Sequence, residues 1–237
     1  MRLTGKTVLV TGGARRIGAT ICVAIAKEGG DVIIHHGHSD REAQELSRRI
    51  RGLGQNAYVI KADLTNPDET LNLISEARKL SQFDAVINNA AIFTSDLFQD
   101  TSLSTWQKNM MINLTAPFLL SQQFSKQKKG RIINILDWRA LRPGADHFSY
   151  TISKAGLVAL TKSLAISLAP DFPVNGLAFG AILPPSDSGK VPNILDKIPA
   201  RRWGKLTEVG EVIVFLLTGP EYITGEIIHL DGGRHLI

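Results

Sequence analysis

Near its N-terminus the chain joins a strand, a glycine-rich turn and a helix without interruption. Residues 6–11 (KTVLVT) are rich in β-branched side chains and predict a buried strand. Residues 12–18 (GGARRIG) then open a helix with apolar residues at 21–26, and a second strand is predicted at 31–35. Glycines in such a turn let the backbone approach a ligand, and the helix N-terminus offers free N–H groups to a pyrophosphate. This unit predicts a dinucleotide site, although such a turn also occurs as a simple tight connection.

The rest of the chain continues to alternate strands with helices. Further strands are predicted at 57–61, 84–88, 131–136, 173–178 and 226–230. Helices are predicted at 41–53, from about 66 onwards, and at 103–125, 148–169 and 208–217, with Ser149 as a candidate N-cap. This order predicts an α/β fold, a single-domain, Rossmann-like, doubly wound parallel sheet of about seven strands with helices on both faces. We expect one domain, 1–237, with a substrate loop rich in proline, serine and glycine at about 184–200.

Composition and charge argue against several classes of function. Of the 237 residues 43% are hydrophobic and 21% charged, as in ordinary soluble domains. No apolar run reaches the roughly 18 residues of a membrane span, and residues 1–6 lack the apolar core of a signal peptide. The basic residues behind the net charge of +5 are scattered, so we expect an anionic small molecule as partner and no nucleic acid. A single cysteine, Cys22, in a helix pattern fits a cytoplasmic protein.

Tyr150 and Lys154 are four residues apart on a predicted helix and therefore share a face. A free tyrosine has a pKa of about 10, and a nearby ammonium that stabilises the phenolate would lower that pKa and make the hydroxyl a usable general acid. The pair alone is common by chance. Ligands of parallel sheets bind beyond the carboxyl ends of the strands. Four further polar or glycine residues fall at such ends: Gly12, Asn89, Asp137 and Gly180.

The end of the second strand bears on the choice between NAD and NADP. An acidic residue there bonds the ribose 2′-hydroxyl, whereas basic residues accept a 2′-phosphate. Residues 35–39 (HHGHS) contain no carboxylate, and Arg15 and Arg16 add positive charge in the glycine turn. We therefore expect NADP(H), with the phosphate near His36, His38 and Ser39. A metal site is not expected, because these histidines lack an acidic or cysteine partner at matching spacing.

Together these motifs resemble the short-chain dehydrogenase/reductase family over nearly the whole chain. The matching residues are Thr11-Gly12…Gly18, Asp63, Asn88-Asn89-Ala90, Asn113, Tyr150-x-x-x-Lys154, Asn175 and Asp231-Gly232-Gly233. The resemblance implies that Tyr150 donates a proton, that Lys154 holds the nicotinamide ribose, and that Asn113 supports a water-linked proton path. It implies that Asp63 bonds the adenine. Further cofactor contacts are expected from Gly12, Arg15, Arg16, Ile17, Gly18, Leu64, Asn89, Ala90, Gly180 and Ile182.

Departures from the family pattern narrow the expected substrate. The family usually has glycine at positions 16 and 91, serine at 137 and proline at 179, where this chain has Arg16, Ala91, Asp137 and Phe179. Arginine in the turn and aspartate for serine are marks of pteridine reductases, and Phe93 matches the aromatic on which that subfamily stacks its pterin. The resemblance implies NADPH-dependent reduction of a dihydropteridine to the tetrahydro form. The substrate is then expected to contact Arg16, Phe93, Asp137 and Tyr150.

The residue types suit that chemistry, and alternatives remain open. A flat pterin can stack on Phe93, which could otherwise be a core aromatic, and Arg16 can donate to a pterin oxygen and a cofactor phosphate. One alternative is a general carbonyl or 3-oxoacyl reductase, in which the Asp137 carboxylate would repel the developing oxyanion. Another is a catalytically silent NADP-binding protein. Family analogy predicts a homotetramer, and the sequence does not choose among dihydrobiopterin, dihydromonapterin and dihydrofolate.

Overall fold

The protein, seen here as a computed structural model that describes residues 1–183 and 194–237, contains one seven-stranded parallel sheet. The strand order is β3-β2-β1-β4-β5-β6-β7. Their bounds are β1 Thr7–Val10, β2 Asp31–His36, β3 Ala57–Lys61, β4 Ala85–Asn88, β5 Arg131–Asp137, β6 Val174–Phe179 and β7 Ile227–Leu230. The predicted doubly wound parallel sheet is confirmed. The part of the expected substrate loop at 184–193 lies outside the described residues.

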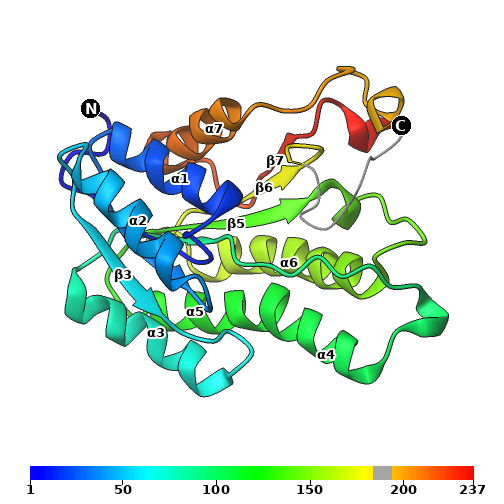
Figure 1. Cartoon of the computed structure of the whole chain (residues 1–237), viewed down its shortest axis with the longest axis horizontal. Coiled ribbons are helices and arrows are strands. Elements are labelled where there is room, and N and C mark those ends of the chain that lie inside the picture. Colours follow the sequence, from blue (N-terminus) through cyan, green and yellow to red (C-terminus); the bar gives the residue numbers. More distant parts are fainter. Residues whose placement is uncertain (184–193) are drawn as a thin grey trace.

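Helices cover both faces of the sheet (Figure 1). One face carries α1 (Arg16–Lys27), α2 (Asp40–Arg51) and α7 (Leu206–Thr218), and the other carries α3 (Pro67–Leu80), α4 (Leu103–Met110), α5 (Ala116–Phe124) and α6 (Phe148–Ser167). Successive strand residues point to opposite faces, so in β1 Val8 and Val10 join the core under α1, whereas Leu9 joins the core on the other side. The sheet is therefore buried on both faces, and its strand ends are left to form a site. No described helix is long and apolar enough to cross a membrane.

The predicted continuous helix at 103–125 is interrupted. A π-helical turn, Met111–Thr115, separates α4 from α5. Pro117 has no N–H and so cannot bond the carbonyl of Asn113, four residues earlier. The backbone widens instead, with the Ala116 N–H bonded to the Met111 carbonyl, five residues back. Asn113 thus sits in an irregular turn that faces α6.

The sequence suggested Ser149 as the N-cap of α6, and the structure does not confirm this. His147 occupies the N-cap position in the left-handed region, at φ 53°, and makes no side-chain cap. Asp96, from the loop after β4, accepts hydrogen bonds from the Ser149 N–H at 3.2 and 3.3 Å. A carboxylate at a helix N-terminus is favoured by the helix dipole. The cap therefore comes from a segment far away in the sequence, which local patterns do not reveal.

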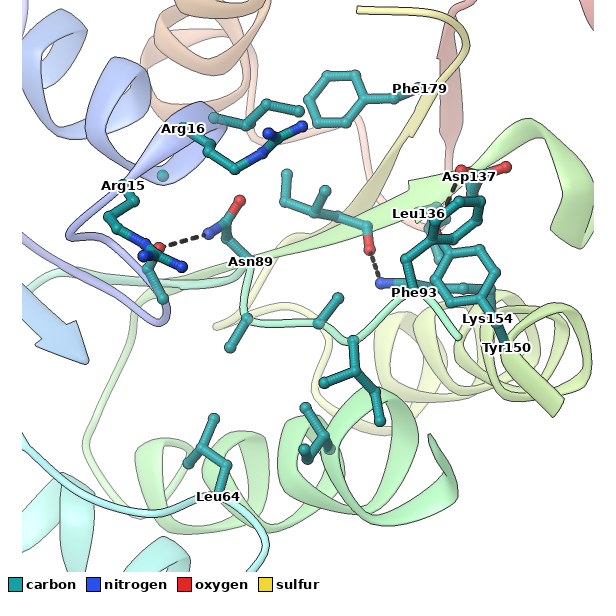
Figure 2. Close-up of a pocket in the computed structure, with 18 of the residues that line it drawn as sticks. Arg15, Arg16, Leu64, Asn89, Phe93, Leu136, Asp137, Tyr150, Lys154 and Phe179 are labelled. Carbon is teal, nitrogen blue, oxygen red and sulfur yellow. Dashed lines mark hydrogen bonds between the residues drawn. The ribbon is translucent and has the colours of Figure 1, made fainter. Parts of the chain in front are cut away.

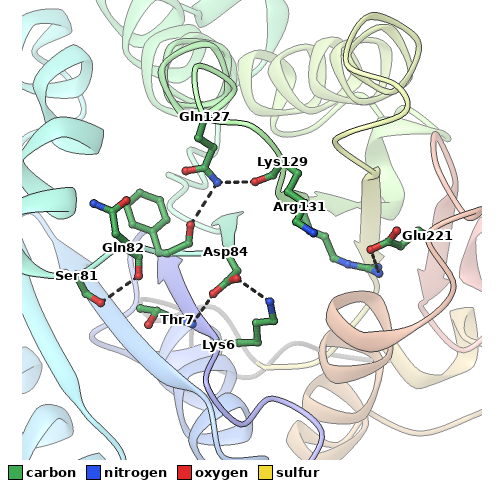
Figure 3. A network of polar contacts seen from close by, with 10 residues as sticks. Lys6, Thr7, Ser81, Gln82, Asp84, Gln127, Lys129, Arg131 and Glu221 are labelled. Atoms are coloured by element: carbon green, nitrogen blue, oxygen red, sulfur yellow. Dashed lines mark hydrogen bonds and ion pairs between the residues drawn. The ribbon is translucent and has the colours of Figure 1, made fainter.

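The amino ends of the strands are tied together by polar contacts (Figure 3). The Asp84 carboxylate accepts from Lys6 Nζ at 2.8 Å and from the Thr7 N–H at 3.0 Å, which joins β1 to the start of β4. Arg131 donates to two carbonyls at the C-terminal end of α7 and lies 3.6 Å from Glu221. These bonds fasten one end of the sheet, so the opposite end is the one available to ligands.

Candidate active site

A cleft of about 1210 Å³ runs along the carboxyl ends of the strands (Figure 2). Its walls come from the glycine turn, the ends of β2, β4, β5 and β6, and the first turn of α6. The cleft brings together Gly12, Arg15, Arg16, Ile17, Gly18, His36, His38, Ser39, Asp63, Leu64, Asn89, Ala90, Phe93, Asp137, Tyr150, Lys154, Gly180 and Ile182. Asn113 is the predicted site residue that does not line it.

The glycine turn is shaped for close backbone approach. Gly12 has φ 59°, and a Cβ there would lie 2.9 Å from Ala90 Cα. A Cβ on Gly18 would overlap the Gly12 carbonyl. His35, which sequence reasoning did not single out, braces this turn: its Nδ1 accepts from the Gly12 N–H at 3.1 Å, and its Nε2 lies 3.1 Å from the Ala62 carbonyl. Burial lowers the pKa of His35 to about 4, so the ring remains neutral and keeps this bonding pattern.

Arg16, the first residue of α1, adopts φ 51°. A residue with a Cβ rarely occupies this region, and holding one there costs on the order of 1 kcal/mol. Glycine would take the same conformation without that cost. The arginine is thus kept at a position whose backbone favours glycine, and its side chain lines the cleft beside Arg15. Arg15 itself lies 3.6 Å from Glu42, an ion pair that is largely solvent-exposed.

The end of the cleft near β2 fits an anionic nucleotide. His36 is buried, and within residues 1–183 and 194–237 its Nδ1 has no hydrogen-bond partner. Burial lowers the pKa of His36, which a bound phosphate oxygen would raise again by accepting a hydrogen bond. At the α1 N-terminus Arg15, at the N-cap position, forms no side-chain cap, and the positive end of the helix dipole favours a phosphate there. The residues present therefore suit a dinucleotide phosphate.

Tyr150 and Asp137 form the polar centre of the cleft (Figure 2). The Tyr150 hydroxyl donates to Asp137 Oδ2 at 3.1 Å, and Asp137 Oδ1 accepts from the Arg139 N–H at 2.8 Å. Burial raises the pKa of both side chains, and the neighbouring carboxylate raises that of Tyr150 further. The expectation that Lys154 lowers the Tyr150 pKa is therefore not met. Tyr150 is therefore protonated at neutral pH, and its hydroxyl can donate a proton.

Lys154 lies close to this pair. Its Nζ donates to the Ile135 carbonyl at 2.7 Å, and the side chain is almost fully buried. Burial lowers the pKa of the ammonium to about 8, although the Asp137 charge opposes that shift. An ammonium has three donors, so those not used by Ile135 remain for a ligand such as a ribose hydroxyl. The centroid of the Tyr150 ring lies 5.9 Å from Lys154 Nζ.

Asn113 acts behind the cleft wall. Its amide donates to the Ile92 carbonyl at 3.1 Å and to Ser153 Oγ at 3.0 Å, while its Oδ1 accepts from the Ile92 N–H at 3.0 Å. Ser153 belongs to the same helix as Tyr150. The side chain thus joins the loop that carries Phe93 to the helix that carries Tyr150. Its predicted part in a water-linked proton path remains a prediction.

Phe93 presents its ring to the cleft and is 45% exposed, which does not fit a core aromatic. Its ring stacks on His147 with centroids 3.9 Å apart, and it meets the Tyr150 ring edge-on at 4.7 Å. His147 is held in turn by a contact of 2.8 Å between Nδ1 and the Thr94 carbonyl. The result is a fixed aromatic wall beside the Tyr150 hydroxyl. Cleft residues that sequence reasoning did not single out also include Trp138, Arg139, Trp203 and Arg234.

The low pKa of Lys154 predicts how activity depends on pH. We expect log kcat/KM to fall with a slope near −1 above a pH of about 8, as the ammonium is lost. The free energy of unfolding should change in the opposite direction. The pKa of Lys154 is about 8 in the folded chain and 10.5 in the unfolded chain, so between these pH values the contribution of Lys154 to stability rises with pH. The check is a pH profile of NADPH oxidation together with thermal unfolding of wild type and Lys154→Met. A flat rate profile to pH 9.5 would contradict the assignment.

A glycine turn that can bind a phosphate and a tyrosine that can donate a proton open onto one cleft, and a nicotinamide-dependent oxidoreductase needs both. Comparison with known proteins agrees with this class. Residues 12–235 match the family model described as enoyl-(acyl carrier protein) reductase. The chain is 35% identical over 240 residues to a 3-oxoacyl-[acyl-carrier-protein] reductase of Synechocystis sp., with 98% of this chain and 97% of that protein covered. It belongs to the short-chain dehydrogenase/reductase family, whose members use NAD or NADP.

Solved structures of similar proteins were determined with NADP. A FolM alternative dihydrofolate reductase 1 from Brucella canis, complexed with NADP, superposes with a TM-score of 0.91 at 34% identity, covering 100% of this chain and 97% of that one. A short-chain dehydrogenase from Burkholderia cenocepacia, in complex with NADP, superposes with a TM-score of 0.93 at 32% identity, covering 99% of each chain. Relatives of similar identity therefore carry different names, and overall similarity does not select a substrate.

Proposed function

We propose that this protein uses NADPH to reduce a dihydropteridine to its tetrahydro form. The observation that carries the proposal is the hydrogen bond from Tyr150 to the Asp137 carboxylate, next to the half-exposed ring of Phe93. A flat heterocycle can lie against Phe93 and find a proton donor and a carboxylate at its edge. The resemblance to FolM dihydrofolate reductases that were solved with NADP supports both the cofactor and the substrate class.

The roles of the side chains follow from their contacts. When bound, NADPH supplies a hydride to the imine carbon of the pterin. Tyr150, which is protonated at neutral pH, gives its proton to pterin N5. Asp137 orients the hydroxyl through its Oδ2 and can pair with a pterin N–H. Lys154 donates to the nicotinamide ribose from the position fixed by Ile135, and Arg16 donates to the pterin oxygen and a cofactor phosphate.

A 3-oxoacyl reductase is the second candidate, because the curated relatives carry that name. The reduction of a ketone builds negative charge on the substrate oxygen, which a serine hydroxyl stabilises and a carboxylate repels. At position 137 this chain places a carboxylate 3.1 Å from the Tyr150 hydroxyl, where the ketone oxygen would bind. This arrangement favours the pterin. A catalytically silent NADP-binding protein has no use for the buried Tyr150–Asp137 pair.

A substrate panel tests the proposal directly. NADPH oxidation should be measured with dihydrobiopterin, dihydromonapterin, dihydrofolate, an acetoacetyl thioester and a simple ketone. We expect at least one dihydropterin to give a kcat/KM well above those of the thioester and the ketone. Turnover of the thioester with none of the pterins would establish the second candidate instead. Binding of NADPH without turnover of any compound would support the silent protein.

The same cleft predicts a preference for NADPH over NADH. Replacing Arg16 by glycine keeps the backbone conformation and removes the side chain with its guanidinium, so NADPH binding should weaken by about 1–3 kcal/mol. The loss for Arg15→Gln should fall at the lower end, since Arg15 also contacts Glu42. Arg41→Gln is the control, because Arg41 is exposed on α2 and does not line the cleft. Fluorescence titrations of the wild type and the variants measure the affinities for NADPH and for NADH. Equal catalytic efficiency of the wild type with both cofactors would refute the preference.

We also propose a homotetramer, the state expected from the family. Apolar side chains on the helices that would pair are exposed: Leu103 on α4 by 71% and Ile166 on α6 by 82%. Burying such surfaces stabilises a symmetric assembly. Light scattering at micromolar concentration should give four times the chain mass of 25.8 kDa. Ile166→Glu should lower that mass, and a monomeric wild type would contradict the proposal.

A further inference from the structure

Beyond Asp137 the cleft carries a second polar group that the proposed reaction does not use. Trp138 lies in the cleft wall with two guanidinium groups near its ring: that of Arg139 at 4.9 Å and that of Arg234 at 4.3 Å from the ring centroid. All three side chains line the cleft. Since Trp138 and Arg139 directly follow Asp137, this group lies at the substrate end, away from the nucleotide-binding turn.

The C-terminal turn holds Arg234 in this place. Asp231 accepts hydrogen bonds from the N–H groups of Gly233 at 2.9 Å and His235 at 2.8 Å, and from His235 Nδ1 at 2.7 Å. The His235 ring also stacks on His229, with centroids 3.9 Å apart. Gly232 and Gly233 supply the positive φ angles of the turn, 65° and 85°. Arg234 is therefore presented to the cleft by a fixed backbone.

The two arginines differ in how their charges are balanced. Arg139 is paired with Asp146, at 2.8 Å. For Arg234, no carboxylate among the described residues lies within ion-pairing distance of the guanidinium. The pKa of Arg234 is lowered by burial and by the charge of Arg139, and the opposing charges of Asp137, Asp146 and Asp231 do not cancel this shift. A cation that is partly buried, beside a like charge and an aromatic ring, is stabilised by an incoming anion.

We infer that Arg234, with Trp138 and Arg139, binds an anionic substituent of the substrate. This inference rests on the proposed pterin reduction and narrows it to dihydropteridines with a negatively charged tail. An aromatic linker can stack on Trp138 while the tail's anion accepts hydrogen bonds from Arg234. Two tails share this chemistry: the carboxylates of the aminobenzoyl-glutamate of dihydrofolate, and a phosphate ester on a pterin side chain. Pterins with an uncharged polyol tail gain nothing from this subsite.

The test compares Arg234→Gln with wild type on three substrates: dihydrofolate, a phosphorylated dihydropterin and uncharged dihydromonapterin. We expect the KM of at least one anionic substrate to rise about tenfold, the order for a charge-assisted hydrogen bond. The values for dihydromonapterin should change less than twofold. Added KCl should raise the anionic substrate's KM in wild type and much less in the variant. Arg142→Gln is the matched control, because Arg142 is exposed on the same segment and does not line the cleft.

The outcomes separate this inference from the proposed function. A rise for dihydrofolate alone identifies a carboxylate tail, and a rise for the phosphorylated pterin alone identifies a phosphate. If wild type reduces dihydropterins and Arg234→Gln changes all three KM values equally or not at all, the anion subsite is wrong and the pterin assignment stands. If wild type reduces none of the three, the proposed function fails and the subsite fails with it.

Discussion

Tyr150→Phe is expected to remove nearly all turnover and leave NADPH binding intact. The change deletes one hydroxyl, whose proton is held in a hydrogen bond of 3.1 Å to Asp137, and retains the ring against which Phe93 packs. General acids contribute about 10²–10⁴-fold, so kcat should fall by that factor. Stopped-flow NADPH oxidation measures the loss, and a fluorescence titration measures the cofactor affinity.

Tyr222→Phe is the matched control for this variant. Tyr222 is fully exposed and lies outside the cleft, so the loss of its hydroxyl should leave kcat unchanged. If Tyr150→Phe retained more than a tenth of wild-type turnover, another group would have to supply the proton. Asp137, whose pKa burial raises, would then be the group to replace next.

Asp137→Ser should separate pterin reduction from ordinary carbonyl reduction. The Asp137 side chain now accepts from both the Tyr150 hydroxyl and the Arg139 N–H. Serine also caps backbone N–H groups well, so the short helical turn at Trp138–Ala140 should persist and the fold with it. We expect pterin turnover to fall by about 10²–10⁴-fold, because the carboxylate no longer orients the proton donor. Activity on simple ketones should rise, since a hydroxyl replaces a repelling charge.

Assays of pterin turnover and of ketone turnover on one preparation of Asp137→Ser check the expected fall and the expected rise. Thermal unfolding of Asp137→Ser should match that of wild type, which excludes a folding defect as the cause. Asp137→Asn is the second variant: it keeps the size of the side chain but not its charge, and it should lose pterin turnover without gaining ketone activity. Full pterin turnover by Asp137→Ser would show that the carboxylate has no part in the proton transfer.

Sequence patterns predicted the sheet well because buried parallel strands are short apolar runs between helices. β3 has the predicted bounds, and β5 is longer than predicted by one residue, Asp137, which still pairs with Phe179 in the ladder. Strand ends carry ligands in such sheets, so placing the strands also placed most of the cleft residues. At position 179, where the family usually has proline, the backbone of Phe179 continues β6 and pairs in register with both neighbouring strands.

The features that sequence reasoning missed depend on contacts between distant segments. Asp96 caps a helix 53 residues further on, and His35 braces the glycine turn from the end of the next strand. Arg234 reaches the cleft through a C-terminal turn whose shape depends on Asp231. The direction of the Tyr150 pKa also depends on position, since spacing shows that Lys154 is near and does not show that Asp137 is nearer. None of these contacts has a local signature.

The left-handed backbone at Arg16 also bears on which substitutions this position tolerates during evolution. Every arginine codon is a single base change from a glycine codon, and glycine at position 16 would relieve the conformational cost of φ 51°. A single base change can therefore replace Arg16 by glycine, and this replacement would relieve the backbone cost in the folded chain. We expect arginine to be retained at this position where its guanidinium binds a ligand, so related sequences that keep it are candidates for the same binding site.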